Sequence, residues 1–183
     1  MNNHDILVSI RCTVFNHGRF LRDCLNGIVS QRTTFRFEAF VHDDASTDGT
    51  AAIIHEYAEK YPDIIKPIYE KENQYSKHDD SLGKIMDEAC TGKYIALCEG
   101  DDYWTDPLHL NKQVTFLEKN PECVYSCCRY LEYNEITKEE RIPPNPFLDE
   151  KNNTYFFLTE IWLLKTFGLQ KHTLQYIGEC QIR

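Results

Sequence analysis

The sequence contains no long apolar run. Its longest apolar stretches, such as residues 94–98, are far shorter than the ~20 residues that a membrane-spanning helix needs. Residues 1–5 offer neither the basic nor the apolar region of a secretory signal, so none is expected. With 42% hydrophobic and 27% charged residues, the 183-residue chain is expected to form one soluble domain with a substantial core.

Basic residues are also few. The chain has 20 Lys and Arg against 29 Asp and Glu, which gives a net charge of -9. Binding of nucleic acid by counterion release needs clustered Lys and Arg, so nucleic acid is not an expected partner. An acidic chain binds a polyanion only through a metal ion or through a few local amides and cations.

The eight cysteines include no Cys-x-x-Cys pair, and several lie inside apolar, strand-like segments. Buried cysteine packs as a small hydrophobic residue, so we predict structural thiols rather than a zinc site or a disulfide framework. This favours a reducing cytoplasmic location and leaves open a peripheral association with the inner face of the cell membrane. Their positions are 12, 24, 90, 98, 123, 127, 128 and 180.

Two glycine-rich signatures are missing. Residues 6–21 contain no Gly-x-Gly-x-x-Gly, and the chain has no Walker-type Gly-Lys-Ser/Thr. These absences disfavour a dinucleotide-binding fold and a P-loop.

The first 130 residues alternate strand and helix patterns, which predicts an α/β sheet, mixed but mostly parallel, with helices on both faces. The Asp106-Pro107 pair is expected to provide an N-cap and a first helical residue. Strands are expected at residues 6–12, 37–42, 64–69, 94–98 and 123–130. Helices are expected at residues 20–29, around 53–57, at 82–89 and from 107 to about 120.

The pattern changes after Tyr133. Residues 134–153 are polar and rich in proline, which indicates a loop or lid, and Thr159 is expected to cap a short helix. We therefore divide the single domain into a core at residues 1–133 and a second part at residues 134–183.

Two acidic clusters follow predicted strands directly: Asp43-Asp44, and Glu99-Gly100-Asp101-Asp102. Ligands of parallel α/β sheets bind at the carboxyl ends of strands, so both clusters are expected at one edge. Either cluster alone is equally well explained as a solvated or capping turn. Together, their carboxylates would repel one another without a cation. Oxygen ligands without nearby His or Cys suit Mg²⁺ or Mn²⁺, which takes further ligands from substrate phosphates.

Three segments carry a family resemblance. VSIRCTVFN at residues 8–16, VHDDASTDGT at 41–50 and GKYIALCEGDD at 92–102 resemble glycosyltransferase family 2, the inverting GT-A nucleotide-diphospho-sugar transferases. The match covers about residues 5–130. It implies a donor-binding GT-A core over residues 1–133, with the lid and the start of an acceptor-binding part over 134–183.

The resemblance also implies roles for individual residues. In the family a Thr-x-Phe/Tyr segment contacts the base, which corresponds to Thr13 and Phe15, and the second Asp of the first pair binds the base, which corresponds to Asp44. Asn16 and Asp43 belong to the same motifs and are counted as nucleotide-binding.

The family's second acidic motif contacts ribose and metal. Here its first position is Glu99, so the ion is expected on Asp101 or Asp102, with Glu99 and Asp101 toward the nucleotide. Lys77 and Lys84 lie where a basic residue would reach the diphosphate, and Lys84 is counted as nucleotide-binding.

Other interpretations of these residues stay open. Phe15 could instead be a residue of the hydrophobic core, and Lys77 and Lys84 could instead lie on a solvent-exposed face. His78 and His172 have no partner at metal-ligand spacing, so structural or surface roles are expected for them. Trp104 either stacks on a sugar or plugs the site.

The implied reaction is an inverting transfer from a nucleotide-diphosphate donor, expected to be a UDP-sugar, to a saccharide or lipid-linked acceptor in cell-surface polysaccharide biosynthesis. In this reaction a carboxylate base deprotonates the acceptor hydroxyl. Glu179 is the only Asp or Glu after residue 160, so it is the one candidate for this base near the end of the chain. The chain resembles a truncated enzyme. A non-catalytic donor-binding module is therefore the second hypothesis, and a metal-dependent phosphatase or nucleotidyltransferase the third.

Overall fold

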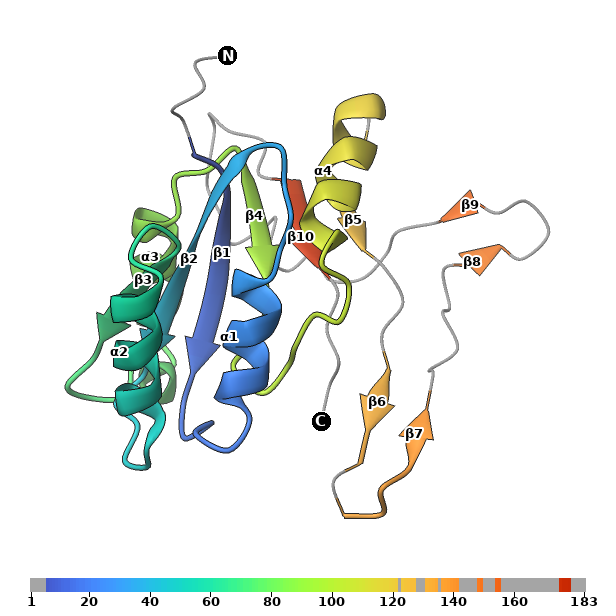
Figure 1. The fold of residues 1–183 in the computed structure, drawn as a ribbon. Coiled ribbons are helices and arrows are strands. Elements are labelled where there is room, and N and C mark those ends of the chain that lie inside the picture. Colours follow the sequence, from blue (N-terminus) through green and yellow to red (C-terminus); the bar gives the residue numbers. More distant parts are fainter. Residues whose placement is uncertain are drawn as a thin grey trace.

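The centre of the protein is one parallel sheet of six strands, in the order β3-β2-β1-β4-β10-β5 (Figure 1). The computed structural model describes residues 6–121, 123–127, 131–134, 136–141, 148–149, 154–155 and 175–178. The strands of this sheet are β1 (Ile6–Val14), β2 (Arg36–Asp43), β3 (Ile65–Tyr69), β4 (Tyr94–Leu97), β5 (Tyr125–Cys127) and β10 (Gln175–Gly178).

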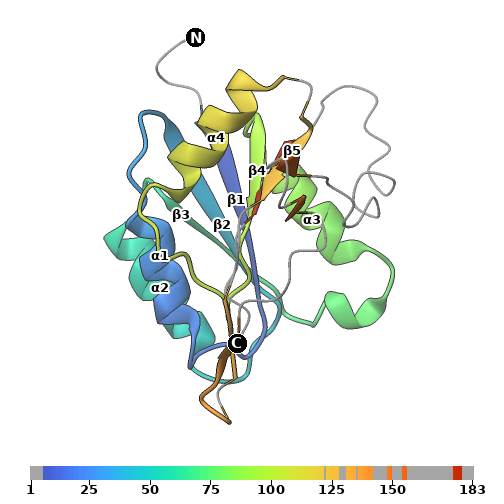
Figure 2. The ribbon, with the colours of Figure 1, turned by 90° about the vertical axis from the view of Figure 1, so that its right-hand side faces the viewer.

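Helices cover both faces of this sheet, as the sequence predicts. Figure 2 shows α1, α2 and α4 on one face and α3 on the other. The helices are α1 (Leu21–Val29), α2 (Thr50–Lys60), α3 (Ser81–Ala89), α4 (His109–Lys119) and the short 3-10 helix η1 (Tyr75–Lys77).

Two short antiparallel ribbons lie in or next to the segment that the sequence assigns to a lid. The first pairs β6 (Glu132–Tyr133) with β7 (Glu140–Arg141), and the second pairs β8 (Leu148–Asp149) with β9 (Thr154–Tyr155). Thr159, His172 and Glu179 lie outside the described residues. Among the residues that are described, no helix is long and apolar enough to cross a membrane.

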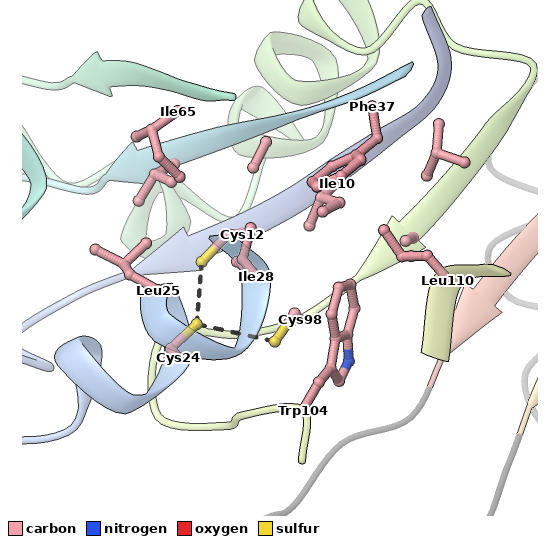
Figure 3. Packing of buried hydrophobic residues seen from close by; sticks show 14 of the residues in the cluster. Ile10, Cys12, Cys24, Leu25, Ile28, Phe37, Ile65, Cys98, Trp104 and Leu110 are labelled. Atoms are coloured by element: carbon pink, nitrogen blue, oxygen red, sulfur yellow. Dashed lines mark hydrogen bonds between the residues drawn. The ribbon is translucent and has the colours of Figure 1, made fainter. Parts of the chain in front are cut away.

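The alternation of β1 separates an apolar face from a polar one. Val8, Ile10, Cys12 and Val14 are buried and pack in the main core with residues of α1 and α4 (Figure 3). Side chains of a strand point alternately to opposite faces, so the intervening residues face α3.

The α3-facing side of the sheet is held by polar contacts. Arg11 donates to Asp87 of α3 at 3.0 Å. Ser9 accepts the N–H of Gly92 at 2.9 Å and donates to Glu38 at 3.2 Å. The two faces therefore differ in chemistry as well as in covering helices.

The predicted start of α4 is wrong by two residues. Helix α4 begins at His109, and its N-cap is Leu108 rather than Asp106. The Asp106 carboxylate accepts the N–H of Leu108 at 2.9 Å, so Asp106-Pro107 forms a turn before the helix. A side chain of another element meets the helix start, because Gln31 accepts the N–H of Leu110 at 3.0 Å. A tertiary contact of this kind leaves no local sequence signal.

Candidate functional site

Both acidic loops are attached to the last residues of β1. The N–H of Asp44 donates to the carbonyl of Val14 at 2.9 Å, and the N–H of Gly100 donates to the carbonyl of Thr13 at 3.1 Å. Because β2 and β4 lie on either side of β1, the loops that follow them meet at the carboxyl edge of the sheet. The prediction that the two clusters share one edge is confirmed.

The loops after β1 and β2 also bind each other. Asn16, in the left-handed region with φ of 56°, donates its N–H to the Ser46 hydroxyl at 2.9 Å and accepts the N–H of Thr47 at 2.8 Å. Thr13 is half-buried at the end of β1. Phe15 is 46% exposed, so the interpretation of Phe15 as a core residue is wrong.

The carboxylates of Asp43 and Asp44 are buried and take main-chain N–H donors. Asp43 accepts the N–H of Ser46 at 3.1 Å. Asp44 accepts the N–H groups of Gln74 at 2.6 Å and Tyr75 at 3.0 Å. Both residues therefore shape the loops around the strand end, and their contact with a nucleotide stays a prediction.

The loop after β4 presents three acids with different exposure. Asp102 is buried, Asp101 is partly exposed and Glu99 is exposed. The pKa of Glu99 is raised, first because surrounding protein displaces water from its carboxyl group and second because the Asp101 carboxylate is near. His17 and Arg11 act against this rise. Glu99 and Asp101 are therefore close enough for their negative charges to oppose each other, as the sequence predicts for this cluster.

His17 is a member of the site that the sequence did not single out. Its Nδ1 atom is buried and lies 3.8 Å from Oδ1 of Asp101. Its carbonyl oxygen accepts the N–H groups of Phe20 and Leu21, which fixes it at the start of α1. Nothing local in the sequence places it beside a loop more than 80 residues further along the chain.

The acidic loop rests on buried thiols. The Sγ atom of Cys24 lies 3.8 Å from those of Cys12 and Cys98 and donates to the carbonyl of Glu99 at 3.3 Å (Figure 3). The hydrogen-bond contact with Cys24, followed by burial, keeps the pKa of the Cys12 thiol well above its ordinary value. The prediction of structural thiols holds for the cysteines described, which form no disulfide.

Trp104 follows the acidic loop and is part of the core. It is 4% exposed, and its ring packs against that of His109 with 4.7 Å between centroids. The interpretation of Trp104 as a sugar-stacking residue is wrong. Gly27 of α1 allows this packing, because a Cβ atom there would lie 2.8 Å from the Trp104 carbonyl oxygen.

The basic residues proposed for the diphosphate make contacts of their own. Lys77 pairs with Glu72 at 2.6 Å, which raises its pKa. Lys84 is exposed on α3, where its Nζ atom donates to the carbonyl of Asp79 at 3.4 Å. His78 lies edge-on to Tyr75, with ring centroids 6.2 Å apart. A role for Lys84 at the diphosphate stays a prediction.

The acids of the site offer an open set of carboxylate oxygens rather than a closed metal cage. In the part of the chain that is described, no group of three or more His, Cys, Asp or Glu is arranged to hold a metal by itself. The expectation that no His or Cys lies near these acids is wrong, because His17 lies beside Asp101 and Cys98 begins the loop, but Glu99 and Asp101 present carboxylate oxygens at its surface. Mg²⁺ and Mn²⁺ accept such donors from one or two carboxylates and complete their shell with water and phosphate.

These features define a class: an α/β domain with two acidic loops that meet at the carboxyl ends of β1, β2 and β4, which is the GT-A fold. The sequence matches the family described as "Glycosyl transferase family 2" over residues 9–174. The chain belongs to glycosyl transferase family 2.

Similar proteins agree with this assignment. The putative glycosyltransferase EpsE of Bacillus subtilis is 42% identical over 113 residues, which is 62% of this chain and 39% of EpsE. Staphylococcus aureus TarS 1-349, solved with UDP, shares the fold with a TM-score of 0.57 and 19% identity over 78% of this chain and 39% of that one.

A third similar protein was solved with both donor and metal. The mannosyltransferase PcManGT from Pyrobaculum calidifontis, in complex with GDP-Man and Mn²⁺, has a TM-score of 0.57 and 25% identity over 69% of this chain and 37% of that one. The chain spans about two fifths of the length of the first curated relatives that it matches.

Proposed function

We propose that this domain binds a nucleotide-diphosphate sugar, with a UDP-sugar as the expected donor, as part of an inverting glycosyltransferase. The observation that supports this most directly is the attachment of both acidic loops to Thr13 and Val14 of β1. It brings the two motifs together where ligands of parallel α/β sheets bind. The acceptor is a saccharide or a lipid-linked saccharide of cell-surface polysaccharide biosynthesis.

Each end of the donor has its own set of residues in this proposal. Thr13, Phe15, Asn16, Asp43 and Asp44 bind the base end. Glu99 and Asp101 face the ribose and diphosphate, with Lys84 as a further contact.

Asp101 and Asp102 would hold Mn²⁺ or Mg²⁺, whose charge would stabilise the leaving diphosphate. The chain's own residues orient the donor and fix the loops. Glu179 is the candidate base for the acceptor hydroxyl.

The proposal is tested by titrating UDP into the chain with and without Mn²⁺. We expect binding that depends on Mn²⁺ and that is lost in the Asp101→Ala, Asp102→Ala double variant. A matched control removes the same charge elsewhere: Glu59→Gln with Asp63→Asn, two exposed acids near the amino-terminal edge of the sheet. Equal UDP binding by the wild type with and without Mn²⁺, or by the acidic-loop double variant, would contradict the proposal.

A second candidate function is a donor-binding module without turnover. The residues proposed above for donor and metal binding all lie within residues 13–102, so donor binding requires no residue of the later segment that carries Glu179. Hydrolysis of a UDP-sugar, assayed under conditions where UDP binds, separates the two functions. Binding without hydrolysis in this chain, with transfer restored in a longer chain, supports the module.

A further inference from the structure

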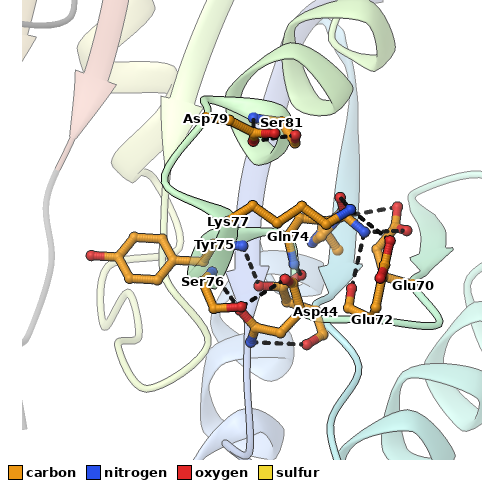
Figure 4. Close-up of polar contacts among 11 residues, drawn as sticks. Asp44, Glu70, Glu72, Gln74, Tyr75, Ser76, Lys77, Asp79 and Ser81 are labelled. Carbon is orange, nitrogen blue, oxygen red and sulfur yellow. Dashed lines mark hydrogen bonds and ion pairs between the residues drawn. The ribbon is translucent and has the colours of Figure 1, made fainter.

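The segment between β3 and α3 is fastened to the end of β2 by Asp44. The Asp44 side chain, 2% exposed, accepts one main-chain N–H on each carboxylate oxygen, from Gln74 and Tyr75 (Figure 4). Asn73 adds a third contact, donating its side-chain amide to the Asp44 carbonyl at 3.3 Å. Three consecutive residues are thus tied to one aspartate.

We call residues 70–77 the pinned turn. Its other polar groups are satisfied largely within it. Ser76 donates its N–H to Asn73 at 2.7 Å, and Gln74 donates to Glu70 at 3.2 Å. Lys77 donates to Gln74 at 2.9 Å, in addition to its pair with Glu72. The backbone of the turn is therefore held by its own side chains, and Lys77 is engaged with the Glu72 carboxylate.

Tyr75 differs from the rest of the pinned turn. Its N–H is fixed by Asp44, yet its side chain is 70% exposed. Figure 4 shows the ring directed away from Asp44 and Gln74. An exposed aromatic ring on a backbone fixed by hydrogen bonds is typical of a binding surface. Its apolar area is in water until a ligand covers it, and burying that area contributes favourable binding free energy.

The position of the pinned turn indicates which part of the donor the ring meets. The pinned turn is hydrogen-bonded to Asp44 at the end of β2, whereas the Glu99–Asp102 loop follows β4 on the other side of β1. In the proposed function, the acidic loop takes the ribose and diphosphate. The opposite, β2 side is left for the base, where Phe15 is also exposed.

We propose that the Tyr75 ring contacts the nucleobase of the donor, and that Asp44 is a positioning residue that acts through the N–H groups of Gln74 and Tyr75. This inference rests on the proposed function. It assigns base contact to a residue outside the three family-like segments. It gives Asp44 an indirect role, in addition to any contact of its own.

The test measures UDP affinity by calorimetry in Mn²⁺ for the wild type, Tyr75→Ala, Tyr75→Phe and Phe116→Ala. Loss of one base–aromatic contact is expected to weaken UDP about 10-fold in Tyr75→Ala, while Tyr75→Phe keeps the ring and stays near wild type. Phe116 is the control, an exposed aromatic residue in the last turns of α4 whose loss should leave affinity unchanged.

The outcomes separate the two ideas. If the wild type binds UDP and Tyr75→Ala binds it equally well, the inference about Tyr75 fails and the proposed function stands. If the wild type binds no UDP, the proposed function fails and the inference fails with it. Equal weakening in Tyr75→Ala and Phe116→Ala would also overturn the inference, because it would show a general effect of removing an exposed ring.

The role of Asp44 is tested by a double-mutant cycle with Tyr75. If Asp44 acts through the pinned turn, Asp44→Ala combined with Tyr75→Ala binds UDP no more weakly than Asp44→Ala alone. Additive losses would overturn the positioning role. Asp44→Asn, which keeps one acceptor oxygen, is carried through the same cycle in case Asp44→Ala does not fold. Faster hydrogen exchange at Gln74 and Tyr75 in the Asp44 variant is expected alongside.

Discussion

The N–H of Gly100 and the carbonyl oxygen of Thr13 are joined by a 3.1 Å hydrogen bond. This hydrogen bond continues the pairing of β4 with β1 beyond Leu97, the last residue of β4. It holds the acidic loop next to the end of β1. The close approach depends on the absence of a side chain at residue 100. A Cβ atom there would lie 2.9 Å from both methyl groups of Val14 and from Nδ1 of His17.

Gly100→Ala is therefore expected to displace the acidic loop. A shift of a few tenths of an ångström or more at Asp101 and Asp102 should weaken Mn²⁺-dependent UDP binding by about 10-fold or more. Gly49→Ala is the control, because a Cβ atom at residue 49 meets nothing within 4 Å. Calorimetry of both variants checks the prediction, and equal affinities for UDP would contradict it.

His17→Ala should also weaken Mn²⁺-dependent UDP binding. The Nδ1 atom is buried and lies 3.8 Å from Oδ1 of Asp101, and we expect it to donate to this carboxylate in the complex with UDP. Because hydrogen bonds to charged groups contribute more than neutral ones, we expect a loss of about 10-fold.

His17→Asn, which has an amide N–H at the δ position, should recover most of the affinity. If His17→Asn binds UDP no better than His17→Ala, the ring acts by packing and not as a donor.

Much of the fold can be predicted from the sequence, because its signals are local. Strand β1 carries buried apolar residues at every second position from Val8 to Val14, and α1 repeats its apolar residues at helical spacing. The acidic clusters could be placed at one edge for a related reason: each follows directly after a strand, and parallel strands end on the same side.

The contacts that shape the site could not be predicted in this way. The bond from Asp44 to Tyr75 spans 31 residues, and the approach of His17 to Asp101 spans more than 80. Tyr75 itself lies in a polar stretch with no periodic pattern, which gave no reason to expect a 3-10 helix there. Trp104 was ambiguous for a similar reason, since only its packing against His109 shows that it faces the core.

Gln31→Leu should destabilise the fold by breaking the contact between the segment that follows α1 and the start of α4. The buried Gln31 amide accepts the N–H of Leu110 at 3.0 Å and donates to the carbonyl of Asp106 at 2.9 Å. Leucine fills similar space but leaves these buried groups unsatisfied, which costs about 1–3 kcal/mol in the free energy of unfolding.

Urea denaturation measures this loss. The control is Thr34→Ala, which removes only an exposed 3.5 Å contact with Asn111 and should change stability by less than about 0.5 kcal/mol. Equal midpoints for Gln31→Leu and Thr34→Ala would contradict the assignment.

His109 should make the protein sensitive to mild acid. Burial lowers the pKa of His109 from its ordinary 6.5 to about 4. The unfolded chain therefore binds a proton at His109 between these values while the folded chain does not, and stability falls as the pH is lowered through this window. The shift corresponds to a loss of roughly 2–3 kcal/mol between about pH 7 and about pH 4.5.

His109→Gln removes this titration without a large change in size. Carboxyl groups titrate in both proteins, so the quantity to compare is the difference between wild type and variant. The free energy of unfolding of the wild type should fall more steeply with acid than that of His109→Gln. Parallel pH profiles would show that His109 is protonated in the folded protein, which would contradict its burial as a neutral ring against Trp104.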